Sequence, residues 1–246
     1  MKKAFSLACL AMVCLAATAQ NVQLHYDLGH TLNGNLSNRQ SVTTTVEMFR
    51  ADTWGSTFFF IDLDYQRDGM AGAYWEIARE FSLVKGNTFA AHVEYNGGLT
   101  SDETTWNATR FQHNFLVGPA WNWHNADFSR TFSLQAMYKH FFKNGHWAQD
   151  AFSSFQLTAV WGMKLAKGWM DFSGFADVWY HKDVQGKLIF LSEPQLWVNL
   201  NKAQGWENVN LSLGAEVELS NNFVYNVNGA NNRFYAIPTV AAKWTF

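Results

Sequence analysis

Cysteine and proline are both scarce in this sequence of 246 residues. It has two cysteines and three prolines, and both cysteines, Cys9 and Cys14, fall within the first 19 residues. A chain without that segment has no thiol, which excludes disulfides, cysteine-based metal sites and cysteine nucleophiles. No run of 18 apolar residues follows Gln20, and this excludes a protein that crosses a membrane with helices.

The first 19 residues have the features of a signal peptide. Lys2 and Lys3 precede a short apolar run, and Ala17-Thr18-Ala19 has the small-x-small pattern of a cleavage site. We therefore expect residues 1–19 to be removed on export and residues 20–246 to form one domain.

The common catalytic and phosphate-binding motifs are absent. The sequence contains no glycine-rich phosphate loop, no His-Glu-x-x-His and no Gly-x-Ser-x-Gly. Its eight histidines are scattered, and none has the spacing of metal ligands. The net charge of −2 gives no basic surface for nucleic acid. We therefore predict no catalytic residue, no metal and no cofactor.

Aromatic residues, by contrast, are abundant. They make up 17% of the chain, with 12 tryptophans, while the mean hydropathy is only −0.19. This combination is typical of strands that alternate between a lipid-facing and a water-facing side. Period-2 alternation predicts twelve strands, at residues 21–30, 40–50, 56–66, 71–82, 88–97, 108–123, 128–141, 151–162, 169–181, 187–199, 208–220 and 232–246.

The two faces of these segments differ in polarity. In 56–66, Phe59, Ile61 and Leu63 alternate with Asp62 and Asp64. A charged group on the lipid face costs about 2–4 kcal/mol at the middle of a membrane, so the charged faces must line a lumen. A soluble lipocalin-like barrel or sandwich is the alternative, but twelve strands with one apolar face each would overfill its core.

The connections alternate in length as they do in bacterial outer-membrane barrels. Short connections follow the second, fourth, sixth and eighth predicted strands, and longer polar ones follow the fifth, seventh and eleventh. This pattern predicts a transmembrane β-barrel in the bacterial outer membrane, surrounded by its lipids, with both termini on the periplasmic side.

The chain also contains an internal duplication. Residues 110–123 align with 233–246, residues 60–68 with 175–183, and residues 91–96 with 215–220. Each half would therefore supply six strands, and the side chains predicted to face inward agree between the halves.

The duplication predicts two sets of charged pairs in the lumen. Because antiparallel neighbours lie symmetrically about a turn, Asp62 is expected opposite Glu76, and Asp177 opposite Glu193. Two adjacent carboxylates repel each other, and such a pair is more often a binding site than a brace. The same geometry pairs the oppositely charged side chains that would brace the wall, Glu94 with Arg110 and Glu218 with Arg233.

Inward aromatic side chains are expected on the same strands as the acids. A ring beside a carboxylate can stack on a cyclic solute while the carboxylate accepts hydrogen bonds from its hydroxyls, although an inward ring can also simply fill space. The predicted solute-binding wall therefore consists of Phe58, Phe60, Asp62, Glu76, Phe175, Asp177, Trp179, Glu193, Trp197 and Tyr235.

Several of these segments resemble a known family. Phe58-Phe59-Phe60-Ile61-Asp62, Trp75-Glu76-Ile77 and Ser192-Glu193-Pro194-Gln195 are similar to the Tsx-like nucleoside-specific channels of the outer membrane. The resemblance implies a monomeric twelve-stranded barrel with weak nucleoside sites along an aromatic and ionisable lumen.

Three functions remain open at this stage. The first is a diffusion channel for small polar solutes, nucleosides on the strength of the resemblance, and the second is a structural barrel with a plugged lumen. The third is a barrel enzyme such as an acyl hydrolase with a lipid-facing serine and histidine. His113 is the only histidine predicted on the lipid face in mid-strand, and no serine lies two residues away. We therefore predict a channel rather than an enzyme.

Overall fold

A computed structural model describes residues 20–37, 39–66, 69–84, 86–101, 108–184, 187–224 and 233–246. The predicted signal peptide lies outside these ranges. The strands are β1 (Gln20–Asp27), β2 (Val42–Asp52), β3 (Gly55–Gln66), β4 (Gly69–Ser82), β5 (Phe89–Ser101), β6 (Ala108–Arg110), β7 (Asn114–His124), β8 (Arg130–Phe141), β9 (Phe152–Leu165), β10 (Met170–Tyr180), β11 (Leu188–Ser192), β12 (Gln195–Asn199), β13 (Leu211–Asn221) and β14 (Phe234–Thr245).

These strands form one antiparallel sheet that closes on itself. β1 pairs with β14, from Asn21 opposite Thr245 to Asp27 opposite Thr239, and the ladder between β9 and β10 joins the other two ends. β6 with β7, and β11 with β12, are each one predicted strand interrupted by a short break. The predicted twelve-stranded closed barrel is therefore confirmed.

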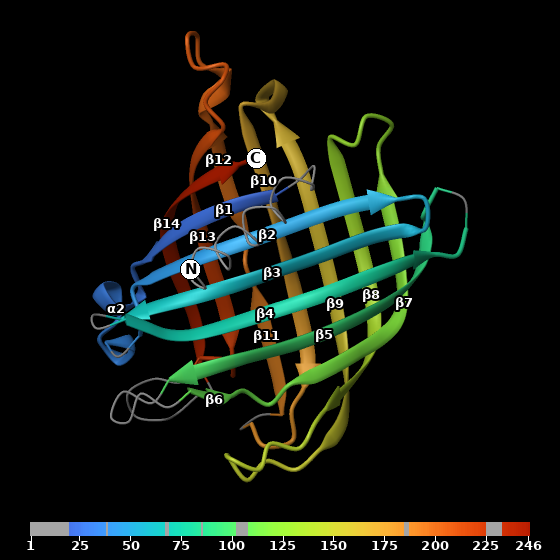
Figure 1. Ribbon diagram of the computed structural model, residues 1–246, viewed down its shortest axis with the longest axis vertical. Coiled ribbons are helices and arrows are strands. Elements are labelled where there is room, and N and C mark those ends of the chain that lie inside the picture. Colours follow the sequence, from blue (N-terminus) through green and yellow to red (C-terminus); the bar gives the residue numbers. More distant parts are fainter. Residues whose placement is uncertain are drawn as a thin grey trace, which may run out of the picture.

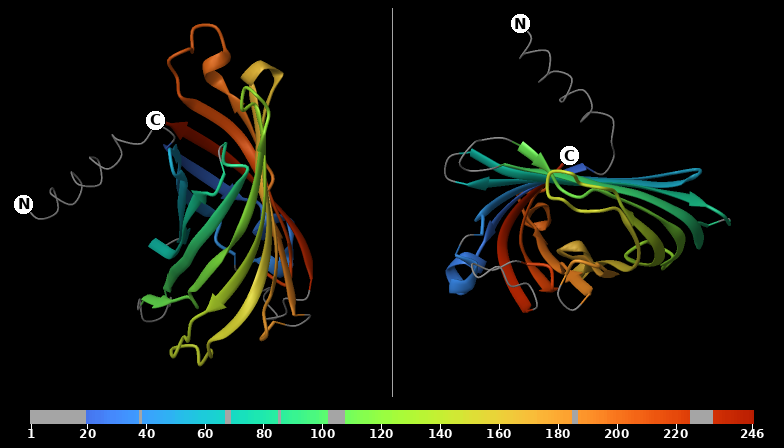
Figure 2. Two further views of the ribbon diagram at one scale, coloured as in Figure 1. Left: turned by 90° about the vertical axis from the view of Figure 1, so that its right-hand side faces the viewer. Right: turned by 90° about the horizontal axis from the view of Figure 1, so that it is seen from below.

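The barrel is strongly flattened. Seen from below in Figure 2, a nearly straight wall of the blue-to-green strands faces a curved wall of the yellow-to-red strands. In Figure 1 the strands β1 to β5 cross in front of the steeper strands β8 to β13. Side chains that project inward from opposite walls can therefore meet.

The two rims of the barrel differ. One rim, called here the turn rim, holds the ends of the described chain at Gln20 and Phe246 and the connections 53–54, 83–88, 125–129, 166–169 and 200–210. The opposite rim, the loop rim, holds the connection 28–41, with helix α2 (Gly29–Leu32) and the 3-10 turn η1 (Gly34–Leu36), and the connections 142–151 and 181–187. The turn rim also carries two 3-10 turns, η2 (Ala166–Gly168) and η3 (Leu200–Lys202). In the described part of the chain, no helix has the length and apolar character to span a membrane.

The outside of the barrel is apolar, and its inside is polar. Large hydrophobic side chains such as Leu134, Phe155 and Leu157 are exposed on the outer surface, whereas Gln156, Thr158 and other polar groups between them are buried inside. A soluble protein would not expose a continuous apolar band of this kind, but lipid covers it at no cost. The protein is an outer-membrane β-barrel.

Two small apolar clusters narrow the barrel near the loop rim. In the first, Leu36 from the connection 28–41 packs inward against Val224, Tyr235 and Ile237. In the second, Val184 from the connection 181–187 packs with three side chains of the wall, Phe141, Trp179 and Ile189. Leu36 and Val184 therefore pack inward from their connections against the wall.

Candidate functional site

The two duplicated aspartates occupy equivalent places in the wall. Thr45 on β2 donates a hydrogen bond of 2.5 Å to Asp62 on β3, and Thr158 on β9 donates one of 2.5 Å to Asp177 on β10. In each half, a threonine on the preceding strand holds the inward carboxylate. This repeated contact agrees with the duplication expected from the sequence.

The predicted pairing of acids on neighbouring strands is wrong by two residues. Asp62 lies opposite Tyr74 in the register of β3 and β4, and Phe60, not Asp62, lies opposite Glu76. The position of Asp177 on β10 corresponds to Leu191 on β11, while the backbone N–H of Glu193 donates to the carbonyl oxygen of Phe175. A displacement of two residues keeps every one of these acids on the inner face.

The acids influence one another across the bore instead. Glu193 lies within electrostatic range of Asp62, and Glu76 within range of Asp177. Each pair takes one acid from each half of the chain. Because Asp62 corresponds to Asp177 in the duplication, and Glu76 to Glu193, the two pairs are equivalent. The flattening of the barrel brings the two walls together, which the order of residues along one hairpin cannot predict.

The first predicted ion pair, Glu94 with Arg110, does not form. Glu94 lies opposite Leu116, and its carboxylate instead contacts His92 Nε2 at 3.0 Å. Arg110 on β6 lies opposite Leu99 on the outer face of the barrel. The break between β6 and β7 reverses which side chains face inward, so the prediction for Arg110 fails together with its partner.

The second predicted ion pair, Glu218 with Arg233, is replaced by a different one. Arg39 donates to Glu218 at 2.5 Å and to Asp27 at 2.6 Å. Burial acts to lower the pKa of the Arg39 guanidinium, but the charges of Glu218 and Asp27 outweigh it and raise that pKa above its ordinary value. Glu218 lies opposite Ile237, and Arg233 is exposed at the loop rim, where it precedes β14.

The predicted inward aromatics do lie on the inner face. Phe58 and Phe60 have ring centroids 6.0 Å apart on the straight wall, and the ring of Phe60 is also 6.0 Å from that of Tyr74. The remaining four, Phe175, Trp179, Trp197 and Tyr235, share the inward side of their strands with Asp177, Asp171 and Ser220.

Side chains fill much of the bore. Trp197, Leu116 and Ser220 each have 0% of their surface exposed although they face inward. The indole N–H of Trp197 donates to Gln195 Oε1 at 3.0 Å, and the ammonium of Lys243 lies 4.2 Å from the ring centroid. Trp197 lies near the turn rim, where β12 ends, whereas Leu116 and Ser220 lie near the loop rim, where β7 begins and β13 ends.

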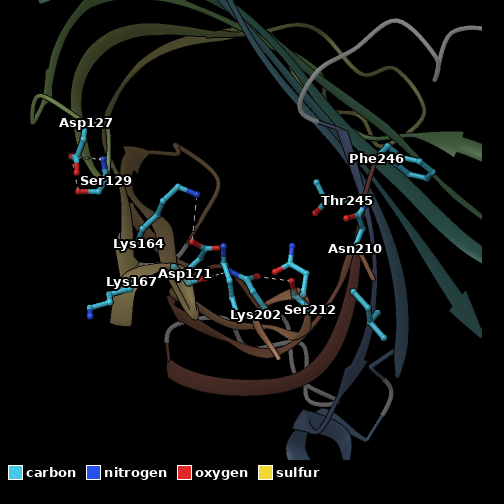
Figure 3. Close-up of a pocket in the computed structure, with 14 residues that line it drawn as sticks. Asp127, Ser129, Lys164, Lys167, Asp171, Lys202, Asn210, Ser212, Thr245 and Phe246 are labelled. Atoms are coloured by element: carbon cyan, nitrogen blue, oxygen red, sulfur yellow. Dashed lines mark hydrogen bonds and ion pairs between the residues drawn. The ribbon is translucent and has the colours of Figure 1, made fainter. Parts of the chain in front are cut away.

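A cavity lies at each rim of the barrel. The one at the turn rim has a volume of about 670 Å³ and contains Lys164, whose ammonium is 3.9 Å from Asp171, together with Lys202 and Asp127 (Figure 3). Hydrogen bonds from Ser129 lower the pKa of Asp127 below its usual value. The cavity at the loop rim has a volume of about 340 Å³ and lies beside Arg39.

The outer surface holds a contact relevant to the enzyme hypothesis. His140, like His113, faces outward, and its Nδ1 lies 3.3 Å from the hydroxyl of Ser153 on the next strand, which also contacts the hydroxyl of Tyr138 at 2.6 Å. His140 lies at the end of β8 rather than in mid-strand, and His113 itself lies in the break between β6 and β7. Within the described residues, no acid or amide orients the second ring nitrogen of His140, as a catalytic pair requires.

Sequence reasoning missed three cations of the bore, Arg39, Lys139 and Lys243. Lys139 alternates in phase with the inward side chains of the strand predicted at 128–141, and this phase was a signal that could have identified it. Arg39 lies in a connection, where alternation gives no direction. Within the described ranges, no three acidic, histidine or cysteine side chains converge as a metal ion would need.

Solved structures share this fold at low sequence identity. One described as a NanC porin has a TM-score of 0.58 and 10% identity, with 93% of this chain and 100% of that chain covered. The KdgM porin gives 0.48 and 10% over 93% and 99%, and LpxR from Salmonella typhimurium gives 0.49 and 7% over 93% and 100%. The likeness to the NanC porin is one of fold alone, and the other two scores carry no argument.

None of the curated proteins matches this sequence. A family model does match it, over residues 19–246, and therefore over the whole barrel. The chain belongs to the family described as "Domain of unknown function (DUF5020)".

Proposed function

We propose that this barrel is a selective channel through which small polar solutes, nucleosides in particular, diffuse across the outer membrane. The observation that carries the proposal is that acids of opposite walls lie within electrostatic range of each other, Asp62 of Glu193 and Glu76 of Asp177. Four carboxylates that face one another in a narrow bore, with aromatic rings on the same strands, suit a ring compound that carries hydroxyl groups.

Each part of a nucleoside has a counterpart in this wall. Phe60 and Phe175 offer faces on which a base can stack, and Asp62 and Asp177 can accept hydrogen bonds from ribose hydroxyls. Such sites must be weak and arranged in series, because a solute that binds tightly does not leave. The cavities at the two rims would receive the solute at entry and exit. The Tsx-like resemblance points to the same solute and to a monomer.

A plugged structural barrel is the second candidate, and the burial of inward side chains favours it. Trp197, Leu116 and Ser220 are completely buried, and Leu36 folds in from the loop rim. For the channel proposal, these side chains must move aside when a solute passes. The two candidates differ in conductance, since a plugged barrel passes no current.

Replacing Asp62 and Asp177 together with asparagine should weaken the block of ion current by nucleosides. Each hydrogen bond to a charged acceptor contributes about 1.5–3 kcal/mol at most, and less in a wet lumen. A site with millimolar affinity has only about 4 kcal/mol in total, so we expect the loss to be at least tenfold in blocking concentration. The open conductance should stay similar or increase. Single-channel recording in planar bilayers with nucleosides, sugars and amino acids measures both quantities.

The matched control is the double variant Asp150→Asn with Glu207→Gln. It removes the same charge from two exposed positions, one at each rim. Nucleoside block should be unchanged in this control. A wild-type protein that conducts but is indifferent to nucleosides would refute the choice of solute, and one that passes no current would favour the plugged barrel.

A further inference from the structure

Lys139 places a positive charge deep inside the bore. Its side chain is only 5% exposed, and its ammonium donates a hydrogen bond of 2.7 Å to Gln156 Oε1. The same ammonium lies 4.7 Å from the ring centroid of Trp179 and 5.2 Å from that of Phe141. Aromatic faces at these distances attract a cation through the negative charge of their π-systems.

Carboxylates surround this ammonium without pairing directly with it. Asp177, Glu94 and Glu76 all lie within electrostatic range of Lys139. Among the described residues, however, no carboxylate oxygen lies within 4.0 Å of the ammonium, and each of the three acids accepts a hydrogen bond from a neighbour on the wall. Since an ionised carboxylate can accept several hydrogen bonds, these acids keep capacity for a further donor.

Two buried amide side chains in this part of the bore also lack a hydrogen-bond donor. Asn96 and Asn114 lie opposite each other on β5 and β7 and are 2% and 7% exposed, and Asn96 also lies opposite Glu76. The side-chain carbonyl oxygen of each has no hydrogen-bond donor among the described residues. This part of the bore is therefore rich in acceptors, and a buried acceptor without a donor is costly.

The bore contains a second lysine whose ammonium lies against a tryptophan ring. The ammonium of Lys243 lies 4.2 Å from the ring centroid of Trp197, with Glu47 and Asp171 within electrostatic range. The two most buried tryptophans of the inner wall are thus each covered by a lysine that is tethered to the barrel itself. Aromatic rings backed by carboxylates are the surroundings that recognise ammonium groups in ligands.

We propose that the ammonium of Lys139 is a tethered occupant of an ammonium-binding site formed by Trp179, Phe141 and Asp177, and that organic cations can occupy this site when Lys139 is removed. The solute class is an organic ammonium, which lies beyond the nucleosides proposed above. A quaternary amine would be held by the rings and by the negative charge, and a primary amine could in addition donate to the acceptors. Binding to the site does not require that any solute pass through the barrel.

The experiment uses the refolded protein with Lys139 replaced by alanine. Isothermal titration calorimetry in detergent measures the binding of tetramethylammonium to this variant and to the wild type. We expect binding at least about tenfold tighter in Lys139→Ala, that is about 1.4 kcal/mol. Adding Trp179→Leu to Lys139→Ala should abolish this gain, because it removes the ring on which the cation would lie.

The matched control is Lys143→Ala, which removes the same charge from an exposed position near the loop rim. It should bind tetramethylammonium no better than the wild type. Lys139→Arg keeps a tethered cation and should also show no gain. If Lys139→Ala does not fold, as judged by the heat-dependent mobility of barrels on gels, Lys139→Gln is measured in its place.

Equal binding by the wild type, Lys143→Ala and the neutral variants at 139 would overturn the proposal, as would a gain that survives Trp179→Leu. These outcomes are separate from the channel proposal. A barrel that passes no current but gains tetramethylammonium binding on loss of Lys139 would retain the ammonium site and lose the transport function.

Discussion

Replacing Arg39 with alanine should destabilise the barrel by about 3–5 kcal/mol, because it leaves two buried carboxylates without their partner. Arg39 donates to Asp27 and Glu218, whose side chains are only 9% and 7% exposed. Unfolding by urea in lipid vesicles, followed by the loss of the fast-migrating folded band on a gel, measures the change in free energy.

Two comparison variants separate the loss of pairing from the loss of charge. Arg130→Ala removes the same charge from an exposed side chain at the start of β8 and should change the stability little. In Arg39→Ala, the further change Glu218→Gln should recover part of the stability, since it removes one of the two unpaired charges. Equal stability of Arg39→Ala and Arg130→Ala would show that the contacts of Arg39 do not hold the connection 28–41 to the wall.

The sequence predicted the barrel well because alternation depends on physics that is local to each strand. A charge on the lipid face is costly wherever it occurs. The positions of charged residues in each strand therefore indicate which of its faces points inward. The predicted direction of a side chain fails where a strand is interrupted. Alternation over 108–123 as one strand predicts Arg110 in the lumen, but the break between β6 and β7 turns this side chain outward.

The contacts inside the bore were much harder to predict. The direction of Asp62, Glu76, Asp177 and Glu193 was correct, but their partners were not, because those partners come from the opposite wall. Distances across a barrel depend on how far it is flattened, and no single strand or hairpin encodes this. Arg39 had no predicted role at all, because a connection has no periodicity to show where its side chains point.

Replacing Gly55 with alanine should be among the most damaging single changes to the wall. Gly55 begins β3 after the two-residue turn 53–54 and has a φ of +145°, where an L side chain is strained by about 1–3 kcal/mol. A Cβ at this position would lie 2.0 Å from the carbonyl oxygen of Glu80, so the backbone of β4 would also have to move. That movement would disturb the hydrogen bond of 2.7 Å from the Ser82 N–H to the Trp54 carbonyl oxygen.

Gly69 provides a matched control for this change. It begins β4 with a φ of +146°, almost the same as that of Gly55, but a Cβ there would meet no atom of the described residues within 4 Å. Gly69→Ala should therefore cost only the conformational strain, about 1–3 kcal/mol. Gly55→Ala should cost this and a further 1–3 kcal/mol or so for the displaced strand, as overpacked sites do. Unfolding by urea in the same vesicles compares the two variants directly. If the two variants were equally stable, the close approach of β4 to Gly55 would not be a feature of the folded barrel. The tight turn between β2 and β3 would then not require the absence of a side chain at this position.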